Sequence, residues 1–336
     1  MPSLQQPIGS GFSAASSAAD VIDGVDLSGK VAIVTGGDTG VGVQTTRALR
    51  SAGATVVVPA RSPQRARAAL AGIDGVEVEQ LDLLDPASVD AFASRFLDSR
   101  RPLHMLVDAA GIHGVPLARD GRGYESQLST NHLGHYQLAM RLWPALLLAG
   151  GARVMSVSAQ AHRLAGVDFD DPQFERRDYD RWLAYGQSKT ANVLFALALD
   201  SLGEPEGVRA FAPSPCTIAG ASLSPWLTRE QLQAMGVVGE RGQPLLDPAR
   251  GCETIAQAAS TIVWCATSPE LDGVGGVYCE NNEVAPIVPV STSATAPASA
   301  ADREKRALGV APHAIDPESA NRLWELSERL TGSSMR

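Results

Sequence analysis

Tyr185 and Lys189, which stand four residues apart, have the clearest potential for chemistry in this 336-residue chain. They lie in Leu183–Leu202, a stretch whose apolar spacing predicts a helix, and residues four apart on a helix share one face. A free tyrosine has a pKa of about 10 and is a poor base at neutral pH. A neighbouring ammonium group favours the phenolate and lowers that pKa, so the pair is suited to proton transfer with a substrate oxygen. A chance pairing on an exposed helix is the alternative.

The segment Thr35–Gly42 has the sequence TGGDTGVG and lies between a predicted strand and a predicted helix. Glycines there allow a tight turn and close approach of the backbone to a pyrophosphate, whose charge the helix N-terminus favours. An ordinary turn is the alternative. The strand before the loop and the helix after it favour dinucleotide binding.

The elements that must position these residues alternate along the chain. Short runs rich in Val and Ile predict strands at Val31–Val34, Thr55–Val58, Val76–Leu81, Leu103–Val107, Val154–Val157, Val208–Phe211 and Gly276–Tyr278. Helical spacing predicts helices at Gly40–Ala52, Pro63–Leu70, Pro86–Leu97, Tyr124–Leu148 and Leu183–Leu202. This alternation predicts an α/β fold, a Rossmann-type doubly wound parallel sheet of about seven strands that binds ligands at the carboxyl ends of its strands.

The predicted organisation is a single domain with a C-terminal helical tail. Residues 1–26 are rich in Ser, Ala and Gly and predict a disordered leader. The Rossmann domain follows over 27–283, a Pro/Ser/Thr/Ala-rich linker over 284–303, and a helical extension over 304–336. In that extension a helix starts at Asp316-Pro317-Glu318, and its apolar face must dock either on its own domain or on a neighbouring subunit.

Composition narrows the function classes. The net charge of −9 and the pI near 5.2 argue against nucleic-acid binding, which needs a basic surface. No run reaches the roughly 18 apolar residues of a membrane helix, so no membrane partner is expected. The 4 cysteines show neither CxxC pairing nor a His-rich context, which favours buried thiols in a reducing, cytoplasmic compartment over a metal site.

Several ordered motifs resemble the short-chain dehydrogenase/reductase family, and in particular its retinol-dehydrogenase-like branch. The glycine loop has the spacing TGxxxGxG, and Asp82 resembles the adenine-contacting Asp after the third strand. Asp108–Gly111 resembles the NNAG motif, Asn131 the branch's catalytic Asn, and Tyr185 with Lys189 the YxxxK signature. The resemblance covers about Leu27 to Glu280.

The resemblance implies roles for these residues. Lys189 would hold the nicotinamide ribose, Asn131 would order a proton-relay water, and Tyr185 would be the acid/base. A homodimer or homotetramer is also implied, with Tyr124–Leu148 and Leu183–Leu202 at its interface. The cofactor-binding residues would be Gly36, Asp38, Thr39, Gly40, Gly42, Arg61, Asp82, Leu83, Ala109, Ala110, Gly111, Tyr185, Lys189, Pro215, Thr217 and Ile218.

The end of the second strand favours NADP(H) over NAD(H). A carboxylate there would bind the ribose 2′-hydroxyl and repel a 2′-phosphate. This chain has Arg61 instead, whose guanidinium suits a phosphate. Asp38 would oppose a 2′-phosphate if it lay close to it, and Arg61 could also be an ordinary solvated arginine.

The sequence departs from the branch at two places. Where the branch has its catalytic Ser, this chain has Ala159, whose methyl group cannot donate a hydrogen bond. Ser158 should face away from the site because adjacent strand residues point to opposite faces, which leaves Gln160 and His162 as polar substitutes. In the segment Ser214–Gly220, Cys216 replaces a Gly and Gly220 a Thr. Loss of one hydrogen-bond donor to the developing oxyanion raises the activation free energy by about 3–4 kcal/mol unless another donor replaces it.

Three functions are compatible with these residues. The first is an NADP(H)-dependent ketoreductase or alcohol dehydrogenase acting on a hydrophobic carbonyl, such as a secondary metabolite, covered by the apolar segment Ser222–Pro248. The second, motivated by Ala159, is non-redox biosynthetic chemistry in the same cleft, such as cyclisation, dehydration or epimerisation. The third is a non-catalytic nucleotide-binding protein, which the retention of Tyr185 and Lys189 disfavours.

Overall fold

The Val- and Ile-rich runs pair into one eight-stranded sheet with the order β10-β9-β6-β5-β4-β1-β2-β3. Neighbouring strands are parallel except for the antiparallel pair of β9 and β10. The computed structural model describes residues 5–218, 228–234, 238–248, 252–289 and 308–335. The predicted doubly wound α/β sheet is confirmed. The eighth strand was missed because β10 is two residues long and has no hydrophobic pattern of its own.

The strands of this sheet are β1 (Val31–Thr35), β2 (Thr55–Ala60), β3 (Val76–Gln80), β4 (Met105–Asp108), β5 (Ala152–Ser156), β6 (Val208–Ser214), β9 (Val277–Glu280) and β10 (Glu283–Val284), and a separate pair is formed by β7 (Thr217–Ile218) and β8 (Cys252–Glu253). The helices are α1 (Ala18–Ile22), α2 (Gly40–Ser51), α3 (Pro63–Ala69), α4 (Pro86–Asp98), α5 (Ser126–Leu128), α6 (Gly134–Leu148), α7 (Arg181–Gly203), α8 (Arg229–Ala234), α9 (Ile255–Ala258), α10 (Ser260–Thr267) and α12 (Pro317–Thr331). Shorter turns are the π-helical η1 (Ser129–Leu133) and the 3₁₀ segments η2 (Gln160–Leu164), η3 (Glu204–Glu206), η6 (Pro269–Leu271) and η7 (Pro312–Ala314).

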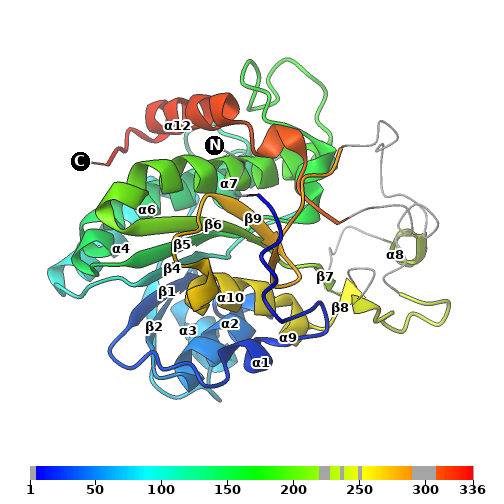
Figure 1. Ribbon diagram of the computed structural model, residues 1–336. Coiled ribbons are helices and arrows are strands. Elements are labelled where there is room, and N and C mark those ends of the chain that lie inside the picture. Colours follow the sequence, from blue (N-terminus) through cyan, green and yellow to red (C-terminus); the bar gives the residue numbers. More distant parts are fainter. Residues whose placement is uncertain (1–4, 219–227, 235–237, 249–251, 290–307, 336) are drawn as a thin grey trace.

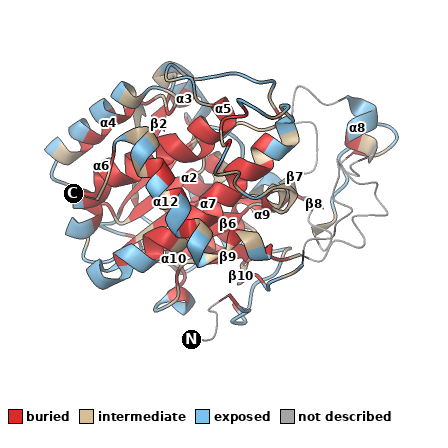
Figure 2. Cartoon of the chain, turned by 90° about the horizontal axis from the view of Figure 1, so that it is seen from above, coloured by how far each residue is buried: buried red, intermediate tan, exposed pale blue. Residues whose placement is uncertain are grey.

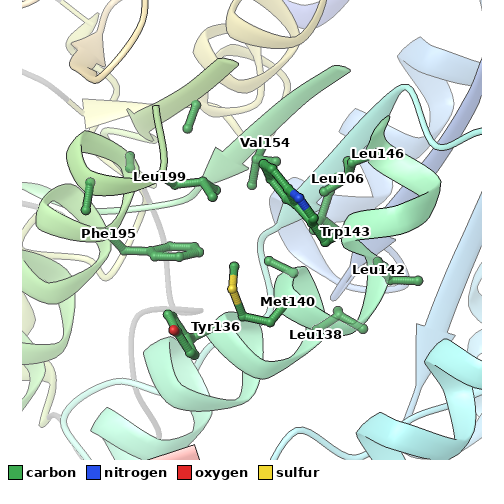
Figure 3. Close-up of a cluster of buried hydrophobic side chains, with 14 of the residues drawn as sticks. Leu106, Tyr136, Leu138, Met140, Leu142, Trp143, Leu146, Val154, Phe195 and Leu199 are labelled. Atoms are coloured by element: carbon green, nitrogen blue, oxygen red, sulfur yellow. The ribbon is translucent and has the colours of Figure 1, made fainter. Parts of the chain in front are cut away.

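Helices cover both faces of the sheet (Figure 1). One hydrophobic core lies between the sheet and α4, α6 and α7, and a second lies between the sheet and α1, α2 and α10. In Figure 3, Trp143 of α6 packs beside Leu106 and Val154 of the sheet, while Tyr136 and Phe195 approach each other between α6 and α7. Figure 2 shows these buried residues, in red, through the centre of the chain. Burial on both faces explains why the strands are almost continuously apolar.

The expected disordered leader is wrong for residues 5–26, which pack on the domain. The Gln5 side chain donates to the carbonyls of Tyr278 (2.8 Å) and Ala285 (2.6 Å) and accepts from the Tyr278 amide (2.9 Å). Helix α1 begins with a capping box in which Ser17 and Asp20 satisfy each other's backbone amides, and its residues Val21 and Ile22 are buried. The composition of this segment did not predict its packing, because a few apolar residues are enough to anchor so short a segment.

The C-terminal helix α12 docks on its own chain, which settles the choice that the sequence left open. Its N-cap, Asp316, accepts from the Ser319 amide. Trp324 packs against Tyr136 of α6 (ring centroids 5.2 Å apart) and Phe195 of α7 (6.1 Å), and the Ser327 hydroxyl lies 2.7 Å from His132 Nε2. Helix α12 therefore covers part of the surface of α6 and α7 on which an oligomer interface was expected.

The linker predicted over 284–303 is wrong for its described part, residues 284–289, which pair with neighbouring segments of the chain. Val284 belongs to β10, and Ile287 forms a parallel bridge with Val310. Residues 290–303 of that prediction lie outside the described residues.

Truncation of Leu323 tests the docking of α12. Because this side chain is 1% exposed, we expect Leu323→Ala to lower the free energy of unfolding by about 2–5 kcal/mol in urea denaturation. The exposed Glu325 on the same helix supplies the control, and Glu325→Ala should change stability by less than about 0.5 kcal/mol. Equal, small effects of both substitutions would show that α12 does not pack in solution.

Candidate active site

The parallel strands bring the predicted site residues to one edge of the sheet. The glycine loop follows β1, Arg61 follows β2, Asp82 comes shortly after β3, and Ala109 follows β4. Ala159 and Pro215 follow β5 and β6 in the same way. The chain leaves β1 toward β2 on one side and later forms β4 on the other. Ligands of doubly wound sheets bind at such a switch point.

The glycine loop packs closely on its inner side. Gly36 has φ +65°, and a Cβ there would lie 2.9 Å from the Ala110 Cα, while a Cβ on Gly42 would collide with the Gly36 carbonyl. At Gly40, the first residue of α2, φ is +49° and a Cβ would meet no atom within 4 Å. The loop is therefore tight against Ala109–Gly111 and open at the start of α2. This shape fits a dinucleotide whose pyrophosphate lies over Gly40, beside Asp38 and Thr39.

Two further positions suit the adenosine end of such a cofactor. Arg61 is exposed, and its backbone carbonyl accepts from Gln80 Nε2 at 3.1 Å. The Asp82 carboxylate accepts from the Leu84 amide at 3.0 Å, and Leu83 is buried. Local hydrogen bonds hold the loops after β2 and β3. The Arg61 guanidinium and the Asp82 carboxylate therefore extend from a backbone with little freedom.

Helix α7 carries Tyr185 and Lys189 as predicted. Its N-cap Asp180 accepts from the amides of Trp182 and Leu183. Lys189 Nζ donates to the Val157 carbonyl at 2.9 Å and lies 5.8 Å from the centroid of the Tyr185 ring. Burial lowers the pKa of Lys189 to about 8.

The expected lowering of the Tyr185 pKa is not what the structure shows. Burial of the phenol raises this pKa above its usual value of about 10, because desolvation disfavours the phenolate. Tyr185 therefore keeps its proton at neutral pH. In this state it is a proton donor, which suits a reaction that creates an alkoxide.

Asn131 lies in the π-helical turn η1, where its side chain holds the loop after β4. Its Nδ2 donates to the Ile112 carbonyl and to Ser188 Oγ, and its Oδ1 accepts from the Ile112 amide, each at 2.9 Å. Both amide hydrogens are thus used, and one acceptor site on Oδ1 remains for the water that the resemblance implies. The role that the geometry shows directly is to position the loop.

The position of the missing serine is occupied by the half-buried methyl group of Ala159. Ser158 faces away, as expected, because its hydroxyl donates to the Lys189 carbonyl at 2.8 Å. His162 cannot substitute for the serine, since its Nδ1 lies 2.8 Å from the Ala159 carbonyl and its Nε2 accepts from the Ala311 amide at 3.1 Å. Gln160 Nε2 is buried without a hydrogen-bond partner among the described residues.

Sequence reasoning missed two side chains that flank Tyr185. The ring of His113 lies 5.8 Å from the Tyr185 ring, and that of Trp182 lies 6.5 Å from it. Trp182 also covers Gly114, where a Cβ would come within 2.8 Å of the indole. Neither residue belongs to a motif, so only the fold brings them together. The sequence signal available for His113 was its place two residues after the NNAG-like motif Asp108–Gly111.

The lip after β6 combines buried acids with a thiol. Cys216 Sγ lies 3.0 Å from Asn281 Oδ1, and burial raises the pKa of both Glu253 and Glu280 to about 7. Thr217 and Ile218 form β7, which pairs with β8. Residues 219–227 and 235–237 lie outside the described residues, and with them much of the expected substrate-covering segment.

Within the described ranges, no group of three or more His, Cys, Asp or Glu side chains is arranged to hold a metal ion. Among those same residues, no helix has both the length and the apolar character required to cross a membrane.

A buried carboxyl group stands at the end of β4. Asp108 is 1% exposed, and neither of its oxygens has a hydrogen-bond partner among the described residues. Burial raises its pKa well above the usual value. The NNAG-like motif therefore carries an acid where an amide is the family pattern.

Comparisons with known proteins agree with this geometry. A family model described as short chain dehydrogenase matches residues 30–230. A Streptomyces lividans protein named "Probable oxidoreductase" is 43% identical, over 90% of this chain and 97% of its own length. Human retinol dehydrogenase 12 is 32% identical, over 92% of this chain and 88% of its own. The crystal structure of an uncharacterized protein from Mycobacterium paratuberculosis superposes with a TM-score of 0.70 and 29% identity, over 96% of this chain and 99% of its own.

The buried Asp108 predicts a pH-dependent gain in stability on substitution. A carboxyl group with a raised pKa in the folded state contributes less stability as pH rises above its unfolded pKa of about 3.9. We expect Asp108→Asn to raise the free energy of unfolding more at pH 8 than at pH 5, because the buried carboxyl group opposes ionisation in the folded state. Urea denaturation at both pH values measures this, with the exposed Asp98→Asn as control. An equal effect of Asp108→Asn at both pH values would contradict it.

Proposed function

Because this chain belongs to the short-chain dehydrogenase/reductase family and is an oxidoreductase of that family, we propose that it reduces a hydrophobic carbonyl compound with NADPH. The observation that carries this proposal is the half-buried Tyr185, whose ring centroid lies 5.8 Å from Nζ of the buried Lys189 on the same helix face. This pair lies at the sheet edge that also carries the glycine loop. A proton donor and a dinucleotide site at one edge are the requirements of carbonyl reduction.

The residues of this chain supply the proton and its environment. When bound, the cofactor supplies the hydride that adds to the carbonyl carbon. Tyr185 gives its phenolic proton to the carbonyl oxygen as negative charge develops there. The ammonium of Lys189 stabilises the resulting phenolate, and its bond to the Val157 carbonyl keeps it in place. A proton from solvent then restores the phenol.

Arg61 supports the preference for NADP(H) over NAD(H). Its guanidinium is exposed at the carboxyl end of β2, where the ribose of a bound dinucleotide lies in doubly wound sheets. A guanidinium pairs with a 2′-phosphate through two parallel hydrogen bonds.

The surroundings of Tyr185 support a hydrophobic substrate. The indole of Trp182 and the imidazole of His113 flank the phenol, so a flat apolar carbonyl compound would be enclosed by rings. Val238, which lies within the expected covering segment Ser222–Pro248, is also buried.

We also propose that the protein forms a homo-oligomer and is located in the cytoplasm. A homodimer or homotetramer would have to use surface that α12 leaves free, since this helix covers part of α6 and α7. A cytoplasmic location is supported by the buried, reduced thiols of Cys265 and Cys279.

Replacing the phenol tests the proposed reaction. We expect Tyr185→Phe to lower kcat for reduction of α-tetralone or all-trans-retinal by about 10²–10⁴, because the general acid is lost. NADPH binding, followed by fluorescence titration, should stay within about twofold of the wild type. Tyr124→Phe is the matched control and should retain full activity. Unchanged kcat in Tyr185→Phe would exclude this residue as the proton donor.

Replacing the guanidinium tests the cofactor preference. A hydrogen bond to a charged group contributes about 1.5–3 kcal/mol, so Arg61→Ala should weaken NADPH binding about 10- to 100-fold and leave NADH binding nearly unchanged. Isothermal titration with both cofactors measures the two effects. Arg329→Ala, on the exposed side of α12, controls for loss of one positive charge. Equal loss for NADPH and NADH would contradict a contact with the 2′-phosphate.

A further inference from the structure

The loop between Gly111 and Gly114 is fixed on both sides of His113. The Asn131 side chain is bonded to both the amide and the carbonyl of Ile112, at 2.9 Å each. The Gly114 amide donates to Gln127 Oε1 at 2.8 Å, and this glutamine is itself buried. The backbone on either side of His113 therefore has little freedom, and the imidazole is held where the loop places it.

The imidazole of His113 has one nitrogen that lacks a protein partner in the described ranges. This nitrogen is Nε2, which is buried. The ring is tilted by 53° against the ring of Tyr185, with centroids 5.8 Å apart. Burial, together with the positive charge of Lys189, lowers the pKa of His113 below its ordinary value. At neutral pH the ring is thus neutral and carries one N–H donor and one acceptor.

An unpartnered buried polar atom destabilises the folded protein, and most buried polar atoms in proteins have a partner. Next to the acid Tyr185, the partner of His113 is expected to arrive with a ligand. The same site lacks a donor, since Ala159 presents a methyl group, and Ser158 and His162 are bonded elsewhere. An imidazole with an unpartnered nitrogen thus lies beside Tyr185, in a site where the family serine is replaced by Ala159.

We propose that His113 donates the hydrogen bond to the substrate carbonyl oxygen that a serine at position 159 would otherwise donate. This inference rests on the proposed carbonyl reduction. The imidazole N–H polarises the carbonyl and stabilises the developing alkoxide, while Tyr185 transfers the proton. The His113 proton stays on its ring, so His113 neither gains nor loses a proton in the cycle. Nε2, the nitrogen without a partner among the described residues, carries the donated N–H in the corresponding tautomer.

The test combines removal of the imidazole with restoration of the hydroxyl. We expect His113→Phe, which keeps the ring packing, to lower kcat for α-tetralone or all-trans-retinal about 10²- to 10³-fold. The Kd for NADPH should stay the same. Adding Ala159→Ser to His113→Phe should recover at least tenfold of the lost kcat. His104→Gln removes a histidine at the opposite end of β4 and should leave kcat unchanged.

A second readout does not depend on turnover. In protein labelled with ¹⁵N-histidine and saturated with NADP⁺, α-tetralone should shift the His113 imidazole resonances, which His113→Phe identifies. Loss of kcat without rescue by Ala159→Ser and without this shift would show a structural role and overturn the proposal.

The failures of the two proposals are distinguishable. If the wild type transferred no hydride to any carbonyl compound, the proposed function itself would be wrong. If the wild type were active and Tyr185→Phe inactive, but His113→Phe were fully active, only the role of His113 would be wrong. In that case a loss of kcat in Gln160→Leu would identify Gln160, whose amide is also unpartnered, as the donor instead.

Discussion

The attachment of helix α7 to the end of strand β5 is the interaction on which the rest of the site depends. The Val157 carbonyl accepts from Lys189 Nζ (2.9 Å) and Asn192 Nδ2 (2.8 Å). In return, the Ser158 hydroxyl donates to the Lys189 carbonyl at 2.8 Å. These bonds are buried, where a lost partner costs more than in water. They fix the register of α7 and thereby the position of Tyr185.

This attachment also explains why the substitution at Ala159 leaves the scaffold intact. The serine beside it, Ser158, is part of the attachment, whereas the half-buried Ala159 makes no side-chain hydrogen bond. A change at Ala159 therefore alters the chemistry of the pocket without loosening α7. The loop that Asn131 holds through Ile112 carries, beside Tyr185, the imidazole of His113 that we propose as the replacement donor.

The strands and the glycine loop could be predicted from the sequence because each depends on a local pattern of residues. The strands are apolar because both faces are buried, and the glycine loop needs its glycines wherever it occurs, so both could be found without a structure. The docking of Gln5 and of α12 could not, because each depends on partners far away in the chain. The Tyr185 pKa was predicted in the wrong direction, since burial outweighs the nearby ammonium. His113 was missed because only the fold places it beside Tyr185.

The fate of the hydride tests the central claim most directly. Reduction of α-tetralone, or of all-trans-retinal, with NADPH carrying deuterium at the transferred position should give an alcohol that contains one deuterium on the former carbonyl carbon, with one NADPH consumed per alcohol. Mass spectrometry of the product and absorbance of the cofactor measure both quantities. A product without deuterium, or one formed without NADPH consumption, would contradict carbonyl reduction and favour non-redox chemistry in the same cleft.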